Sequence, residues 1–182
     1  MCLGLAGGGL SESYLKRVTQ LGADCIDFGN DGAFPGVSEQ GYPDLDELLK
    51  IKKRIRSWGL DINRVTLPNI TEQFMTGQSE GEKELENTCN ALRVFAEAGV
   101  PIARQRFWGD TFDYLMTRYP SVHRGGYTSR GESRAATKNP PDTPTMETLD
   151  EWWKHFTEVY GALVPIADEL SLIHISEPTR PY

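Results

Sequence analysis

Five side chains that can bind an anion lie together in a glycine-rich stretch in the second half of the sequence: Arg118, His123, Arg124, Tyr127 and Arg130. They follow a predicted strand, and in parallel α/β proteins the segments after the strands carry the ligand. Arginine can hold a carboxylate through two parallel hydrogen bonds. We therefore predict that His123, Arg124 and Tyr127 bind an anionic ligand. The alternative is a solvated basic loop or a subunit contact.

A second candidate lies where the fourth predicted strand ends. Successive side chains of a strand point to opposite faces, so either Arg104 and Arg106 or Gln105 and Phe107 face the inside of the sheet. A buried arginine needs a partner of opposite charge, and an anionic ligand would supply one. We predict that Arg106 binds the ligand. An ion pair within the protein is the alternative.

Histidine and cysteine are too sparse for a metal centre in this chain. A manganese or iron site needs several imidazole and carboxylate ligands that converge, yet only His123 and His155 precede the last thirteen residues. We expect His155 to be a partly exposed residue of a helix. Cys2, Cys25 and Cys89 are widely spaced and odd in number, which predicts free thiols. We assign no catalytic residue and no metal ligand to the chain.

The composition excludes several classes of protein. Of the 182 residues 38% are hydrophobic and 25% charged, as in a folded single domain. The 19 basic and 26 acidic side chains give a net charge of −7, which disfavours nucleic acid as a partner. No apolar run approaches the roughly 18 residues that span a bilayer, and the N-terminus lacks the basic start of a signal peptide. We expect a cytoplasmic protein with neither a nucleic-acid nor a membrane partner.

The elements that position these candidates alternate between strand and helix four times. Ser11 and Asp44 are predicted helix N-caps, the second with Glu47 three residues later. Glycines that follow the periodic stretches end the helices. Strands are expected over residues 2–6, 25–28, 60–67 and 100–103, and helices over 11–22, 44–59, 80–99 and 146–169. The segments 29–41, 68–79 and 104–144 are expected to be loops, the last one long enough to be a functional or lid segment.

Four βα units in a row predict a parallel sheet covered by helices. A closed (β/α)₈ barrel usually needs about 250 residues. We therefore predict an α/β fold that consists of the first four βα units of a TIM barrel, truncated, over residues 1–169. Its open strand edges and uncovered inner face predict that it folds poorly alone.

The last thirteen residues, LSLIHISEPTRPY, resemble the translation of an adapter used in sequencing libraries. Residues 170–176 alternate as a strand would, but the helix that ends at Glu169 has no glycine cap before them. We therefore predict that residues 170–182 are a non-native tail outside the fold. His174 is accordingly not a ligand candidate.

Short segments throughout residues 2–169 resemble one enzyme family. The segments are Gly4-Leu5-Ala6-Gly7-Gly8, Tyr14-Leu15-Lys16, Gln20-Leu21-Gly22, Leu67-Pro68, Glu84-Leu85-Glu86-Asn87, Ala98-Gly99-Val100-Pro101-Ile102, Arg124-Gly125-Gly126, Trp152 and Val164-Pro165-Ile166-Ala167-Asp168-Glu169. Together they look like the N-terminal half of mannonate dehydratase, which belongs to the xylose-isomerase-like TIM barrels.

The resemblance implies a lyase of sugar-acid metabolism, which dehydrates D-mannonate to 2-keto-3-deoxygluconate in glucuronate catabolism. It also implies a divalent metal, Mn²⁺ or Fe²⁺, in the full-length enzyme, with the ligands on later strands. The fragment itself is then expected to be inactive and to bind no metal, and the full-length enzyme to be a homo-oligomer. Asn69 is predicted to bind a sugar hydroxyl, with a turn or helix cap as the alternative, and Trp108 to form an apolar wall for the sugar.

Three alternatives stay open. The family usually has an acidic residue before its Leu-Pro, and this chain has Thr66 there. A related sugar isomerase or epimerase is therefore one alternative. Gly7 and Gly9, with Asp27 after the second strand, partly match a dinucleotide-binding fingerprint, although Glu12 stands where the third glycine belongs. The third alternative is a truncated product that has no activity.

Overall fold

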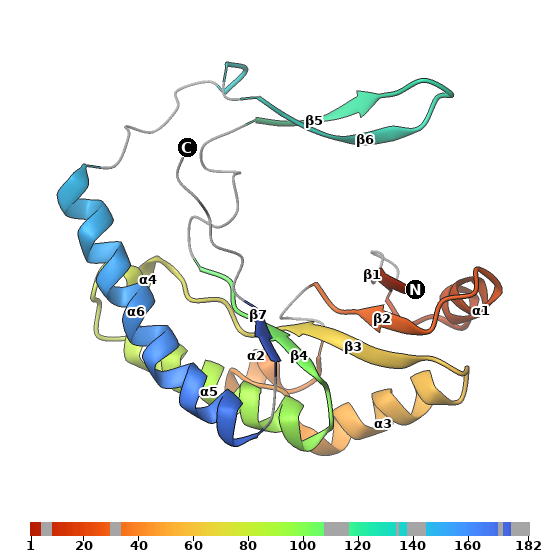
Figure 1. The fold of residues 1–182 in the computed structure, drawn as a ribbon, viewed down its shortest axis with the longest axis horizontal. Helices are drawn as coiled ribbons and strands as arrows, with labels where there is room; N and C mark the ends of the chain where they lie inside the picture. The colour runs from red at the N-terminus through yellow and green to blue at the C-terminus, as the bar shows by residue number, and fades with distance from the viewer. Residues whose placement is uncertain are drawn as a thin grey trace.

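The structure, a computed structural model, describes residues 1–4, 9–29, 34–107, 117–133, 135–137, 145–170 and 173–175. Figure 1 shows its mixed α/β arrangement. Its strands are β1 (Cys2–Gly4), β2 (Cys25–Asp27), β3 (Asp61–Thr66), β4 (Ile102–Arg104), β5 (Thr117–Val122), β6 (Thr128–Ser133) and β7 (Ile173–Ile175). Its helices are α1 (Glu12–Gln20), α2 (Val37–Gln40), α3 (Leu45–Arg56), α4 (Glu72–Met75), α5 (Gly81–Glu97) and α6 (Met146–Glu169).

The main sheet is parallel, with the strand order β1-β2-β3-β4-β7. Along the chain, each strand of this sheet takes the next position in the same direction. A dinucleotide-binding sheet instead reverses direction at the strand where its ligand binds. The observed order is consistent with part of a TIM-barrel-like fold and argues against the dinucleotide-binding alternative.

The predicted N-caps are confirmed and explain where the helices begin. The Ser11 hydroxyl accepts a hydrogen bond from the Tyr14 backbone N–H at 3.2 Å, at the start of α1. The Asp44 carboxylate accepts one from the Glu47 N–H at 2.9 Å, at the start of α3. Each bond satisfies one of the N–H groups that a helix leaves without a partner in its first turn.

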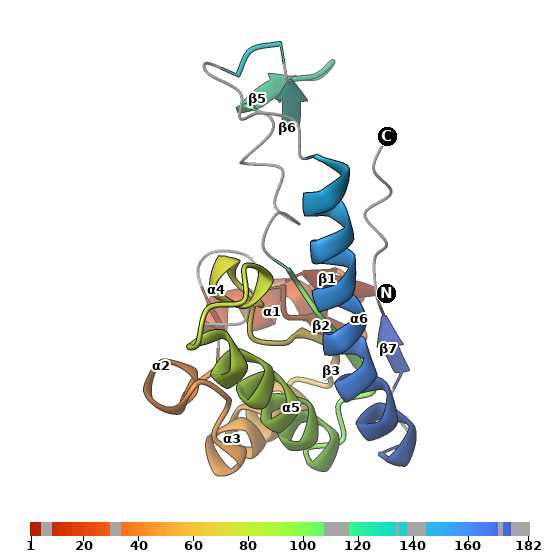
Figure 2. The same ribbon diagram turned by 90° about the vertical axis from the view of Figure 1, so that its left-hand side faces the viewer.

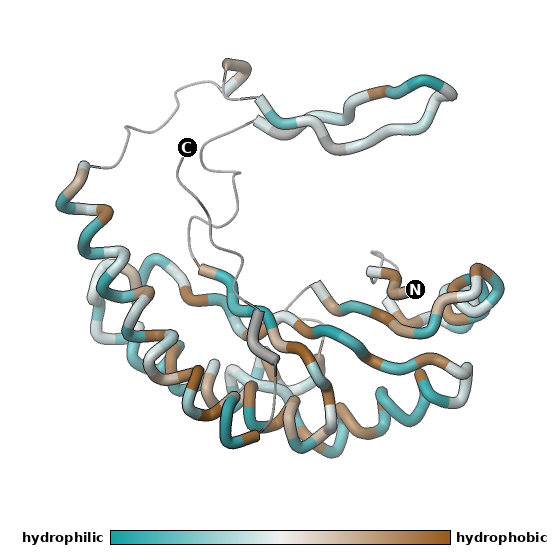
Figure 3. Tube along the Cα trace, viewed as in Figure 1, coloured by the Kyte–Doolittle hydropathy of each residue, from teal (hydrophilic) through white to brown (hydrophobic). Residues whose placement is uncertain are grey.

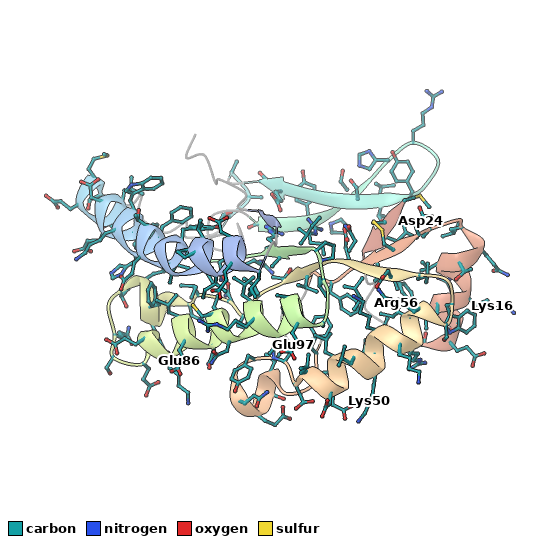
Figure 4. The ribbon with its side chains drawn as sticks, turned by 60° about the horizontal axis from the view of Figure 1, so that its bottom comes forward. Lys16, Asp24, Lys50, Arg56, Glu86 and Glu97 are labelled. Carbon is teal, nitrogen blue, oxygen red and sulfur yellow. A yellow bond between two sulfur atoms is a disulfide. The ribbon has the colours of Figure 1, made fainter. Side chains whose placement is uncertain are left out.

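The core lies between the sheet and the helices α1, α3, α5 and α6. Figure 3 shows hydrophobic stretches along these helices and strands. Three aromatic rings join the sheet to α5, since Phe34 lies 4.7 Å from Phe28 and 5.1 Å from Phe95, between ring centroids. Charged residues such as Lys50 and Glu86 lie on the outer sides of α3 and α5 in Figure 4. Other core side chains are Leu15, Ile26, Leu48, Ile55, Ile62, Val65, Leu92, Val159 and Leu163.

Regular structure occurs in three segments that the sequence predicted to be loops. The helix α2 lies within 29–41 and α4 within 68–79. The strands β5 and β6 form an antiparallel hairpin within 104–144. Its turn contains Gly125 and Gly126, both with positive φ (91° and 80°), a conformation that glycine adopts without steric cost. The prediction of an irregular segment is therefore wrong for residues 117–133.

The C-terminal segment also differs from the prediction. Residues Ile173–Ile175 form β7, which pairs with β4 so that His174 lies opposite Ala103. The alternating residues suit a strand, and the edge of β4 offers a row of backbone groups to pair with. Residues 173–175 of the predicted tail thus pair with the sheet, and the non-native origin of residues 170–182 stays a prediction. The side chain of His174 lies outside the described residues.

The cysteine prediction is wrong for two of the three thiols. Cys2 and Cys25 form a disulfide between β1 and β2, visible near Asp24 in Figure 4. The parallel register places these two residues directly opposite each other, with Cα atoms 4.6 Å apart. Spacing along the chain does not reveal such a juxtaposition. Cys89 is free, and burial raises the pKa of its thiol.

A membrane span requires a long and apolar helix. None of the helices in the described part of the chain meets that requirement.

Candidate anion-binding face of the sheet

The backbone after β4 decides which arginines face the inside of the sheet. Extended pairing continues beyond the strand, because the Ile70 N–H donates to the Arg106 carbonyl at 3.0 Å and Ile70 bridges to Phe107. Phe107 packs on α6, its ring 4.9 Å from that of Phe156. Gln105 is buried, only 3% exposed. Because side chains alternate, Arg104 and Arg106 point to the face opposite the helices.

Asn69 lies beside Arg106 on the neighbouring segment, where the chain leaves β3. Its side chain is exposed. The Pro68 carbonyl accepts hydrogen bonds from the side chains of Gln105 (3.0 Å) and Thr88 (3.2 Å), which hold this segment in place. The N-cap of the following helix α4 is Thr71, so Asn69 does not have that structural role. The structure thus brings two of the predicted residues, Asn69 and Arg106, to the same edge of the sheet.

A polar network that the sequence prediction missed lies on the same face. The Asn63 amide donates to Asp27 Oδ1 at 3.0 Å, and Arg64 Nη2 lies 3.5 Å from Asp27 Oδ2. The register shifts between Ile26 and Asp27, so that Ile26 pairs with Ile62 whereas Asp27 pairs with Arg64. This irregularity turns both Asn63 and Arg64 toward the carboxylate.

The sequence carries a weak signal for this network. An aspartate that ends one strand and an arginine within the next are unusual in the buried strands of a parallel sheet, which are mostly apolar. The Asp27 carboxylate of this network is engaged by the Asn63 amide and by the Arg64 guanidinium. Together with Arg104 and Arg106, it makes the inner face suited to anions and hydroxyl groups.

Three other predicted residues, His123, Arg124 and Tyr127, lie in the β5–β6 hairpin. The rings of His123 and Tyr127 stack, with centroids 5.0 Å apart and planes 9° from parallel, and Arg124 lies in the turn between them. All three side chains are exposed. Figures 1 and 2 both show the hairpin apart from the main sheet. The structure therefore brings His123, Arg124 and Tyr127 to one another but not to the strand ends.

The prediction for Trp108 is not tested, because this residue lies outside the described residues. The side chains of Arg118 and Arg130, which accompany the anion-binding candidates in the sequence, also lie outside them.

The donor groups of the described residues do not fit a manganese or iron site. No group of three or more His, Cys, Asp or Glu side chains converges among them. His155 is a partly exposed residue of α6, as predicted, with Nδ1 3.5 Å from Glu158 Oε2 and its ring against Phe74. No step that uses a metal can be derived from these side chains.

Comparison with known proteins identifies a solved structure of similar fold. No protein-family model matches the chain. The crystal structure of mannonate dehydratase from Streptococcus suis serotype 2 is similar, with a TM-score of 0.75 and 18% sequence identity. The alignment covers 98% of this chain and 53% of that enzyme, so the chain spans about half the length of the protein it matches. The chain therefore has a fold similar to about half of a mannonate dehydratase.

Proposed function

We propose that the chain is the N-terminal part of a sugar-acid lyase that dehydrates D-mannonate to 2-keto-3-deoxygluconate. The observation that carries the proposal is the structural likeness to a mannonate dehydratase over 98% of the chain. The short sequence segments that resemble the same family support the proposal as well. The rest of the protein would supply the metal ligands and the catalytic groups.

The chemistry assigns this chain a binding role. Loss of water beside a carboxylate needs a base that takes the α-proton and an acid that protonates the leaving hydroxyl. Asn69 and Arg106, on the same edge of the sheet, would bind a hydroxyl and the carboxylate of the substrate. A guanidinium suits the carboxylate because it donates two parallel hydrogen bonds. Holding the carboxylate fixes the adjacent carbon relative to the base.

The proposal predicts binding without turnover. Titration of the chain with D-mannonate, followed by calorimetry, should show saturable binding that Arg106→Met weakens about tenfold or more, as expected for a charged hydrogen-bond partner. Arg54→Met is the matched control, because Arg54 is exposed on α3, outside the proposed site. Circular dichroism should show both variants folded.

Three outcomes would contradict parts of the proposal. Binding of a neutral aldose such as xylose, unaffected by Arg106→Met, would favour a sugar isomerase or epimerase. Equal weakening of D-mannonate binding by Arg106→Met and Arg54→Met would remove the assigned role of Arg106. Incubation with D-mannonate and Mn²⁺ should give no 2-keto-3-deoxygluconate, and measurable turnover would show that the chain itself holds a catalytic centre.

A further inference from the structure

Gln105 is a buried polar residue at the point where the two segments of the candidate site lie side by side. It is on the helix-covered side of the sheet, whereas its neighbours Arg104 and Arg106 point to the other side. Its side-chain amide donates to the carbonyls of Pro68 (3.0 Å) and Arg106 (2.7 Å). Pro68 precedes Asn69 in the chain. One side chain therefore links the backbones that carry both residues assigned to the ligand.

The two segments differ in length between the hydrogen bonds that join them. The Leu67 N–H donates to the Arg104 carbonyl at 2.9 Å, and the Ile70 N–H donates to the Arg106 carbonyl at 3.0 Å. One segment thus advances from position 67 to 70 while the other advances from 104 to 106, so the first contains one extra residue. An extra residue of this kind is a β-bulge, and bulges beside ligand sites change the direction of a side chain.

The bulge explains why Asn69 is exposed. Leu67 and Ile70 are both at 0% exposure, although residues three positions apart in a regular strand face opposite sides. The extra residue lets both side chains point to the core and leaves Asn69 exposed between them. Pro68, the other residue of the bulge, has no N–H to donate to the neighbouring segment. Its carbonyl accepts the Gln105 amide, so the bulge is held from the core side.

The amide of Gln105 adds a link between the segments and not the satisfaction of a lone carbonyl. The Arg106 carbonyl already accepts the Ile70 N–H. The Pro68 carbonyl already accepts the Thr88 hydroxyl at 3.2 Å. The buried oxygen of the Gln105 amide has no hydrogen-bond partner among the described residues, which costs free energy. A methionine of similar volume would fill the same space without that cost. What the amide contributes is its two donors on two different segments.

We propose that Gln105 is a positioning residue that sets the separation between the side chains of Asn69 and Arg106. Its amide holds the bulge at residues 67–70 against the backbone that follows β4. A hydroxy acid that places a hydroxyl on Asn69 and its carboxylate on Arg106 then meets both groups at a fixed spacing. Groups that are held in place before binding lose less freedom when the ligand binds. This role rests on the proposed function, which assigns those ligand groups to the two residues.

A double-mutant cycle separates positioning from general stability. Gln105→Met keeps the volume and removes the link, and calorimetry should show D-mannonate binding to the complete chain weakened about fivefold, as for one lost hydrogen bond. In an Asn69→Ala background the same substitution should weaken binding less than about twofold, because no spacing remains to be held. Thr88→Val is the matched control, since it removes the other side-chain donor to Pro68 and keeps the link. It should leave binding unchanged.

Amide hydrogen exchange tests the link without any ligand. The Ile70 N–H bonds to the segment of Arg106 after the bulge, whereas the Leu67 N–H bonds to that segment before it. In Gln105→Met the Ile70 amide should exchange about fivefold faster or more, and the Leu67 amide at its former rate, because only the bulge opens more often. A general loss of stability would speed up both amides. Far-ultraviolet circular dichroism should show each variant folded.

Three results would overturn the positioning role. The first is equal weakening of binding by Gln105→Met in the wild-type and Asn69→Ala backgrounds. The second is a Thr88→Val variant that binds as weakly as Gln105→Met, and the third is an Ile70 amide whose exchange Gln105→Met leaves unchanged. A wild-type chain that does not bind D-mannonate would contradict the proposed function instead. Faster exchange at Ile70 alone would then still support the link, so the two failures are distinguishable.

Discussion

The helix-covered side of the main sheet and the β5–β6 hairpin represent two extremes of burial in one chain. On this side the sheet residues Ile26 and Val65 and the α5 residue Phe95 are only 0–1% exposed. The hairpin has Val122 at 72% and Tyr127 at 62% exposure. Both regions are hydrogen-bonded β-structure, so backbone pairing is common to them and packing is what differs.

This difference indicates where stability resides and where binding is to be expected. Burial of apolar surface is the main favourable term in folding, so the sheet and its helices should dominate the free energy of unfolding. The hairpin adds little to that term. The exposed side chains of Arg124, Tyr119 and Tyr127 are therefore available for intermolecular contacts. Substitutions in the two regions should differ most in their effect on stability.

The largest effect on the free energy of unfolding is expected for a substitution of Phe95. Phe95→Ala should lower the free energy of unfolding by about 3–5 kcal/mol, because it removes a buried ring between the sheet and α5. Denaturant titration followed by circular dichroism measures the change. Val122→Ala, in the hairpin, should change the same quantity by less than about 0.5 kcal/mol. Similar losses in the two variants would contradict the division between the regions.

A smaller effect is expected at Lys52, a buried lysine that holds the end of α5. Its ammonium donates to the carbonyls of Ala98 and Gly99, both at 2.7 Å, where the helix leaves carbonyl groups without partners. Lys52→Met keeps the apolar stem and should cost about 1–3 kcal/mol of unfolding free energy, the penalty for unsatisfied buried groups. Lys53→Met, at the exposed neighbouring position, is the control. Equal stability of the two variants would disprove the role of the ammonium.

A loss of about 1 kcal/mol is expected at the N-cap of α3. Asp44→Ala removes the acceptor for the Glu47 N–H and should lower the unfolding free energy by about 0.5–2 kcal/mol. Asp46→Ala, two residues further and inside the first turn, removes a similar charge without the cap bond and should cost less. Thermal unfolding monitored at 222 nm compares the two, and a reversed order would rule out the cap as the cause.

The smallest effect is expected in how the free energy of unfolding depends on alkaline pH. Burial lowers the pKa of Lys52 below its ordinary value of 10.5, whereas the nearby Asp61 raises it less. Between the lowered pKa and 10.5 the unfolded chain binds more protons than the folded chain, so this group makes stability rise with pH. Lys52→Met should lose that contribution, and Lys53→Met should keep it. Denaturant midpoints measured across this window give the difference.

The sequence predicted those parts of the fold that depend on neighbours within one turn of helix. Ser11 and Asp44 cap their helices through backbone groups three residues away. Of the apolar residues at helical spacing in α1 with its C-cap and in α3, Leu15, Val18, Leu48 and Ile55 are buried, whereas Leu21 and Leu49 are exposed. We did not predict the hairpin because Pro120 and the polar residues around it lack the alternation of apolar and polar residues that marks a strand. Gly125 and Gly126 do indicate a turn.

The candidate site could be predicted only in part. Asn69 and Arg106 were recognised as residues at strand ends, and the sheet places them on adjacent segments. The contact of Asp27 with Arg64 depends on a register shift between strands that are distant in the sequence. The grouping of His123, Arg124 and Tyr127 with the strand ends assumed an ordinary loop, whereas the hairpin carries them away from the sheet.

The sequence alone determined the alternation of strands and helices, the helix caps and the charge of each segment, since these depend on residues close together in the chain. The tertiary structure decided which face of the sheet Arg106 points to and that Cys2 and Cys25 form a disulfide. It also decided that the hairpin lies apart from the main sheet. The physical reason is that strand register and packing join residues that lie tens of positions apart. Their contacts are chosen by the burial of the whole core and not by the preferences of any one segment.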